Sequence, residues 1–203
     1  MKTLIIVDPQ NDFMPGGSLA VPNGDEIIPV INKLQKKFDL VIASQDWHPK
    51  AHASFASSHM GKKEFETIDL NGTEQVMWPE HCVQNTDGAE FNENLKTAKI
   101  EAIFRKGTNP EIDSYSAFYD NKHLKSTGLT GYLKEKKADD LYFCGLAAEI
   151  CVYFTAKDAI KEGFKATIIE DATRALDAED FKKAKAELED LGGKIITAEA
   201  IEN

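Results

Sequence analysis

The stretch Thr3-Leu4-Ile5-Ile6-Val7, closed by Asp8, is a short run of apolar and β-branched residues. A continuous run of this length is typical of a strand that is buried on both faces. Similar runs recur at residues 40–44, 100–105, 140–145, 165–169 and 194–197. Because patterns of helical period lie between several runs, the sequence predicts an α/β fold, a three-layer sandwich around a central, mostly parallel sheet of about six strands.

Two segments between these runs have the spacing of amphipathic helices. In residues 25–37, the apolar positions on one face are Ile27, Ile28, Ile31, Leu34 and Phe38. In residues 178–191 they are Phe181, Ala184, Leu188 and Leu191, with Gly192-Gly193 as a stop signal. We expect both segments to form helices that cover the sheet.

The composition restricts the class of protein. A chain of 203 residues with 42% hydrophobic content can bury one substantial core, so we expect a single domain over residues 1–203. A net charge of -10 argues against nucleic acid or an anionic membrane as a partner. Three cysteines do not make a disulfide framework, and the apolar run before Asp8 is too short for a signal peptide. We therefore predict a cytoplasmic protein with free thiols, and a homo-oligomer stays open.

Asp46 and His48 follow the run at residues 40–44 and lie two positions apart. In an extended chain, residues i and i+2 point to the same side, so the carboxylate and the imidazole leave the strand together. His81, in Trp78-Pro79-Glu80-His81, can complete the set from another loop. One carboxylate and two histidines suit a divalent ion, zinc before iron or manganese, with positions open for water or substrate.

The segment at residues 49–99 fits the strand-and-helix rhythm poorly, and we interpret it as a metal-site loop insertion. It contains His52, which is a candidate fourth ligand, a donor that supports a ligand, or a loop histidine without a role. His59 and His123 have no supporting context, so we expect them at the surface.

A second group of reactive residues lies at the ends of predicted strands. Asp8 ends the first run, Lys106 ends the run at residues 100–105, and Cys151 follows Gly145 at the start of a predicted helix. Ligands of parallel α/β sheets bind outside the carboxyl ends of the strands. A thiol in the first turn of a helix has a lowered pKa, Asp8 can accept its proton, and Lys106 can stabilise both anions.

Each of these residues also has a structural interpretation. Cys151 can be a buried core cysteine, which is the interpretation we favour for Cys144 and Cys82. Asp8 can be a turn former before Pro9, and a lone lysine is most often solvated. The aromatic residues near the proposed elements are candidates for a pocket wall or for ordinary core packing: Phe13, Trp78, Tyr115 and Phe118.

The ordered motifs of this chain resemble those of the nicotinamidases in the isochorismatase-like cysteine hydrolase family. They are Ile5-Ile6-Val7-Asp8-Pro9-Gln10-Asn11-Asp12-Phe13, Gly16-Gly17-Ser18-Leu19, Asp46-Trp47-His48-Pro49, Trp78-Pro79-Glu80-His81-Cys82-Val83, Lys106-Gly107-Thr108, Asp113-Ser114-Tyr115-Ser116-Ala117-Phe118 and the Gly145 to Cys151 turn. The chain departs from the family pattern at Ala148-Glu149, at Ile150, which lines the pocket if the resemblance holds, and at Asn85.

The resemblance implies a Rossmann-type, isochorismatase-like fold and an Asp8–Lys106–Cys151 triad. It also implies a metal held by Asp46, His48 and His81, an oxyanion hole from the N–H groups of Ala147 and Cys151, and a cis bond between Leu146 and Ala147. The expected reaction converts nicotinamide and water to nicotinate and ammonia in NAD salvage, with pyrazinamide as a further substrate.

Three alternatives stay open from the sequence. A related amidase acting on carbamoyl or ureido substrates would keep the triad without needing a ring-binding metal. A metal-dependent hydrolase without a covalent step would be insensitive to thiol alkylation. A non-enzymatic metal-binding module would leave the combination of Asp8, Lys106 and Cys151 unexplained.

Overall fold

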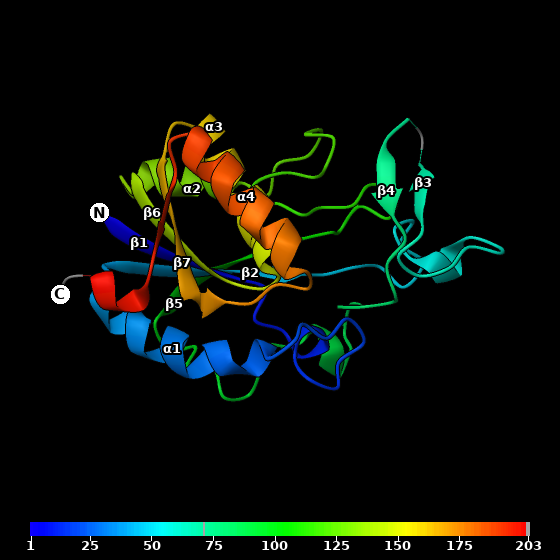
Figure 1. Cartoon of the computed structure of the whole chain (residues 1–203), viewed down its shortest axis with the longest axis horizontal. Coiled ribbons are helices and arrows are strands. Elements are labelled where there is room, and N and C mark those ends of the chain that lie inside the picture. Colours follow the sequence, from blue (N-terminus) through cyan, green and yellow to red (C-terminus); the bar gives the residue numbers. More distant parts are fainter. Residues whose placement is uncertain (71, 202–203) are drawn as a thin grey trace.

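The computed structural model describes residues 1–70 and 72–201, and its centre is a six-stranded parallel sheet (Figure 1). The strands are β1 (Lys2–Val7), β2 (Leu40–Asp46), β5 (Ile100–Lys106), β6 (Asp140–Gly145), β7 (Lys165–Thr173) and β8 (Lys194–Ile196). Their order is β5-β2-β1-β6-β7-β8, and every neighbouring pair is parallel. All six predicted strands are confirmed, and so is the predicted α/β class.

Helices cover both faces of the sheet, as α1 (Ile27–Leu34) lies on one side and α2 (Leu129–Glu135), α3 (Tyr153–Lys161) and α4 (Ala178–Asp190) lie on the other (Figure 1). The alternation along β1 produces this arrangement. Leu4 and Ile6 pack in the hydrophobic cluster that contains α1, whereas Ile5 and Val7 pack in the cluster that contains the other three helices. The sheet is therefore the middle of three layers.

The two predicted helices are present with shorter bounds. In the first segment only Ile27–Leu34 is α-helical, and 3-10 turns at Gly24–Glu26 and Gln35–Lys37 flank it, as is common at helix ends. In the second, Ala184 and Leu188 are buried, but the prediction for Leu191 is wrong because this residue is 44% exposed. Leu191 lies beyond the last residue of α4, where the chain turns at Gly192.

Residues 49–99 also contain an antiparallel pair that the sequence did not predict, β3 (Thr67–Asp69) and β4 (Glu74–Val76). This pair projects from one end of the molecule, away from the main sheet (Figure 1). Each strand has three residues and little apolar content, so it lacks a readable period. Gln75 of β4 is nevertheless buried, and its Nε2 donates to Asp113 Oδ2 at 3.0 Å.

Since the strands are parallel, their carboxyl ends meet at one edge of the sheet. Asp8 follows β1, Asp46 ends β2, Lys106 ends β5, and Cys151 follows β6 after a short connection. Asp46 and Lys106 are partners in the β2–β5 register. Among the residues described, none of the helices combines the length and apolar content needed to cross a membrane.

Candidate active site

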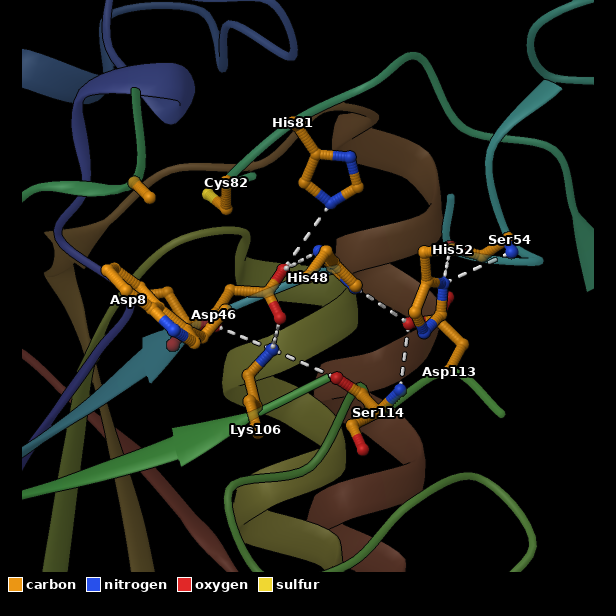
Figure 2. A network of polar contacts seen from close by, with 12 residues as sticks. Asp8, Asp46, His48, His52, Ser54, His81, Cys82, Lys106, Asp113 and Ser114 are labelled. Carbon is orange, nitrogen blue, oxygen red and sulfur yellow. Dashed lines mark hydrogen bonds and ion pairs between the residues drawn. The ribbon is translucent and has the colours of Figure 1, made fainter. Parts of the chain in front are cut away.

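The Lys106 side chain is the centre of a buried polar network (Figure 2). Its Nζ lies 2.9 Å from Asp8 Oδ2 and 3.1 Å from Asp46 Oδ1. The same ammonium donates to the Ser114 carbonyl at 2.9 Å and approaches Cys151 Sγ at 3.5 Å. One cation therefore contacts the predicted base, the predicted nucleophile and a predicted metal ligand.

Burial and neighbouring charges together shift the pKa values of the three predicted triad residues. Burial raises the pKa of Asp8, although Lys106 opposes this shift. Burial likewise raises the pKa of the Cys151 thiol well above its usual range, against the attraction of Lys106. The expectation of a lowered thiol pKa at the helix start is therefore wrong, because burial outweighs the favourable charges. Burial disfavours the Lys106 ammonium, but Asp46 and Asp8 outweigh it and raise the pKa of Lys106. The thiol is therefore neutral at rest beside a carboxylate with increased proton affinity, which is the arrangement for proton transfer during attack rather than before it.

Asp8 and Cys151 both lie in segments with an unusual backbone conformation. Asp8 has a φ of 46°, so the chain turns sharply out of β1 at this residue, and Ser44 Oγ donates to its Oδ1 at 2.7 Å. Cys151 lies in a single π-helical turn, Ala148–Val152, that leads directly into α3. The Leu146–Ala147 peptide bond before this turn is cis, as the family resemblance implied.

The imidazole of His81 turns its Nε2 toward Asp46. Its Nδ1 lies 2.8 Å from the Pro79 carbonyl, which can only accept, so Nδ1 carries a hydrogen. Its Nε2 faces Asp46 Oδ2 at 3.4 Å. This orientation places a potential metal-ligand nitrogen beside the Asp46 carboxylate.

His48 lies on the other side of Asp46, and against the effect of burial its imidazole has a pKa raised by Asp46 and Asp113. Its Nε2 lies 3.4 Å from Asp113 Oδ1, and its Nδ1 lies 3.5 Å from Asp46 Oδ2 without any hydrogen-bond partner. Burial alone would raise the pKa of Asp46, but His48 and Lys106 lower it, so this carboxylate is ionised. Asp46, His48 and His81 thus bring one carboxylate and two ring nitrogens together in a buried position, and this donor set fits a divalent ion.

His52 lies beside this group rather than within it. It forms a second candidate cluster with His48 and Asp113, and its ring lies 4.5 Å from that of His48. The Ser54 backbone N–H donates to His52 Nδ1 at 3.1 Å, which leaves the hydrogen of the neutral ring on Nε2. In this tautomer Nε2 has no lone pair for a metal.

A small cavity joins the two groups of residues. Four of the five residues predicted for the pocket wall line it together with Asp46, His81 and Cys151: Phe13, Trp78, Tyr115 and Ile150. Phe118, by contrast, is fully buried in the core beneath the sheet and packs against Phe164, so its packing interpretation is the correct one. Cys82 and Cys144 are buried and free, and His59 and His123 lie outside the cavity.

Sequence reasoning assigned no role to several buried polar residues around the site. Asp113 contacts His48 and accepts from Gln75 Nε2 at 3.0 Å, and Gln10 contacts the backbone of Asp46. The sequence indicated these roles only weakly, because Asp113 and Gln10 appear in it only as members of family motifs. Gln75 comes from β4, whose position relative to the sheet no local pattern reveals.

The chain is similar to known proteins over most of its length. The isochorismatase domain model matches residues 2–200. The nicotinamidase of Acinetobacter baylyi is 51% identical over 174 residues, which cover 86% of this chain and 81% of that protein. The solved Acinetobacter baumanii nicotinamidase/pyrazinamidase superposes with a TM-score of 0.95 at 47% identity, covering 98% of this chain and 96% of that one. The Pyrococcus horikoshii pyrazinamidase, solved in complex with zinc, gives a TM-score of 0.80 at 38% identity, covering 97% and 98%.

Proposed function

The chain belongs to the isochorismatase family, and we propose that it works there as a nicotinamidase, which hydrolyses nicotinamide to nicotinate and ammonia. We propose pyrazinamide as a further substrate, because two solved relatives are described as pyrazinamidases. The observation that carries the proposal is the position of the Lys106 ammonium, which contacts both Asp8 and Cys151. Cys151 in turn lines a cavity together with aromatic residues.

In the proposed first step, the Cys151 sulfur forms a bond to the carboxamide carbon while its proton moves to Asp8. The Lys106 Nζ lies 2.9 Å from Asp8 Oδ2 and 3.5 Å from Cys151 Sγ. The carboxylate oxygen and the sulfur can therefore be no farther apart than the sum of these two distances. The ammonium offsets negative charge on either partner as the proton moves. The electron pair of the carbonyl bond goes to oxygen, for which we propose the Ala147 and Cys151 N–H groups as donors.

In the second step, the carbon–nitrogen bond breaks and ammonia leaves with the proton from Asp8. This leaves a thioester on Cys151. Water then adds to the thioester carbon, with Asp8 as the base, and nicotinate leaves while the thiol recovers its proton. The pathway uses no oxidant or further reactant, and the raised pKa of Asp8 suits a group that accepts and returns one proton in each half of the cycle.

We propose Asp46, His48 and His81 as the ligands of one divalent ion, zinc before iron or manganese. The two buried imidazoles within 3.5 Å of the Asp46 carboxylate and the zinc in a 38% identical relative support this set. When bound, the ion would act as a Lewis acid toward the ring of the substrate. We propose His52 as a supporting neighbour, since its Nδ1 accepts from Ser54.

Phe13, Trp78, Tyr115 and Ile150 are proposed to hold the pyridine ring, because all four line the cavity between Cys151 and His81. We also propose one domain over residues 1–203, supported by two hydrophobic clusters that share a single sheet. Three free, buried cysteines support a reducing location such as the cytoplasm.

The direct test compares Cys151→Ala with Cys144→Ala in an assay of ammonia release from nicotinamide. Cys144 is a fitting control because it is also free and fully buried, but lies within β6. The proposal expects activity to disappear in the first variant and to persist in the second. Turnover near the wild-type rate in Cys151→Ala would exclude a covalent cysteine mechanism.

A further inference from the structure

Gln10 is fully buried directly after the Asp8-Pro9 turn, and its side chain bonds to the backbone of Asp46. Gln10 Nε2 donates to the Asp46 carbonyl at 2.7 Å, and Gln10 Oε1 accepts from the Asp46 N–H at 2.7 Å. A further bond from Nε2 to the Ala89 carbonyl, at 2.9 Å, occupies its second hydrogen. The amide therefore uses both hydrogens and its oxygen, with Asp46 held at two points.

The course of β1 explains why Asp46 needs such a partner. The β1–β2 register runs from Thr3 opposite Leu40 to Ile6 opposite Ala43 and goes no further, because β1 turns away at Asp8. Strand β2 continues to Asp46, which still pairs with Lys106 on its other side. On the β1 side, the Gln10 amide takes the place that the next peptide group of β1 would occupy. Without it, a buried N–H and a buried C=O would lose their partners.

We propose that Gln10 is a positioning residue that holds the Asp46 carboxylate in place for metal binding. The carboxylate lies 3.1 Å from Lys106 Nζ, 3.4 Å from His81 Nε2 and 3.5 Å from His48 Nδ1. All of these contacts depend on where the Asp46 backbone lies at the open end of β2. The proposal rests on the proposed role of Asp46 as a ligand, and it adds that the turn carrying Asp8 also fixes the metal site.

The neighbouring residue Gln45 offers a matched control. It is also a buried glutamine, and its Nε2 donates to the same Ala89 carbonyl at 3.0 Å. Its Oε1, however, accepts from Arg105 Nε at 3.1 Å rather than from the Asp46 backbone. Replacing either glutamine with methionine keeps the volume and removes the hydrogen bonds. Both variants lose a bond to Ala89, so a difference between them reports on Asp46.

The test measures zinc affinity of the full-length protein by competition with a chromophoric chelator, without substrate. We expect Gln10→Met to weaken zinc binding by about 10–100-fold, the usual effect of removing a group that supports a ligand, and Gln45→Met to retain wild-type affinity. Urea unfolding of the metal-free variants separates this effect from general destabilisation. The variant Gln10→Glu tests the geometry a second time, because the carboxylate of Glu would face the carbonyl oxygens of Asp46 and Ala89 without a hydrogen to donate. We expect this variant to bind zinc no more tightly than Gln10→Met does.

Wild-type zinc affinity in folded Gln10→Met would overturn the inference, as would equal weakening in Gln45→Met. If the wild-type protein bound no zinc, the proposed ligand set would fail and the inference with it. If zinc affinity behaved as expected but nicotinamide were not hydrolysed, the proposed activity would fail while the role of Gln10 would stand. Measuring metal affinity apart from turnover therefore distinguishes the two claims.

Discussion

Lys106 and Asp46 are register partners at the last positions of β5 and β2, and the Lys106 Nζ lies 3.1 Å from the Asp46 Oδ1. The same Nζ lies 2.9 Å from Asp8. The proposed triad and the proposed metal ligands are therefore joined by one buried ammonium, and a change at Lys106 should affect both groups.

Lys106→Met should remove activity and lower the free energy of unfolding by about 3–5 kcal/mol, since it leaves buried carboxylates without their cation. Ammonia release and urea unfolding measure the two effects. The double variant Lys106→Met/Asp8→Asn should recover part of the stability without recovering activity, because it removes one of the unpaired charges. A double variant less stable than Lys106→Met alone would contradict this account.

Asp8→Asn should reduce kcat for nicotinamide by about 100–10,000-fold, the usual contribution of a general base. The amide keeps the shape of the side chain but cannot accept the thiol proton. Alkylation of Cys151 by iodoacetamide, followed by mass spectrometry, provides a readout that does not depend on turnover. It should also become slower, and an unchanged alkylation rate together with an unchanged kcat would exclude Asp8 as the base.

Gly107→Ala should disturb the metal ligands directly. A Cβ at this position would lie 2.8 Å from Asp46 Oδ1 and 2.8 Å from His48 Nε2, and Gly107 has a φ of 68°. Gly163→Ala is the matched control, because its φ of 88° imposes similar backbone strain while the added Cβ meets nothing within 4 Å. We expect both variants to lose stability but only Gly107→Ala to lose zinc affinity, measured by chelator competition. Equal zinc affinity in the two variants would contradict the proposed site.

Removal of the metal by a chelator should raise KM for nicotinamide more than it lowers kcat. The proposed role of the ion is to hold the ring, while Cys151, Asp8 and Lys106 carry out the acyl transfer. Steady-state kinetics before and after chelation, with zinc added back as a control, measure the two constants. If turnover disappeared at saturating nicotinamide and returned with zinc, a metal-activated water would be the better mechanism.

The pH dependence of the unfolding free energy should show that His52 is buried in its neutral form. Burial, reinforced by the neighbouring His48, lowers the pKa of His52 to about 4 from its ordinary value of 6.5. Between these values the unfolded chain binds a proton that the folded protein does not, so stability falls as the pH falls from 6.5 toward 4. The total effect of this group is about 3 kcal/mol.

His52→Asn should therefore make the unfolding free energy of the metal-free protein less dependent on pH in this range, whatever its effect at neutral pH. Its side-chain oxygen can still accept from the Ser54 N–H, as Nδ1 does. His59→Asn serves as the control from the same loop, outside the cavity. Urea unfolding at several pH values measures the slope, and a slope equal to that of wild type would exclude a buried neutral His52.

The main sheet could be predicted because strands buried on both faces appear as continuous apolar runs, and Leu4 to Val7 show this directly. The short strands β3 and β4 could not be predicted, since each has three residues and at most one buried side chain, which is too few to show a period. Leu191 was assigned to a buried face because periodicity does not reveal where a helix ends. The geometric roles of Gln10 and Asp113 also escaped prediction, because a buried amide or carboxylate reads locally like any polar residue.

The sequence by itself determined the class of fold, the strands and the reactive residues at their carboxyl ends, because apolar periodicity and chain order are local properties. Only the tertiary structure decided that one ammonium would contact Asp8, Asp46 and Cys151, since these residues come from separate strands and connections. It also decided which nitrogen of His81 faces Asp46, because a carbonyl at Pro79 fixes the hydrogen. Such distances depend on the register and twist of the whole sheet, which no segment of the sequence specifies alone.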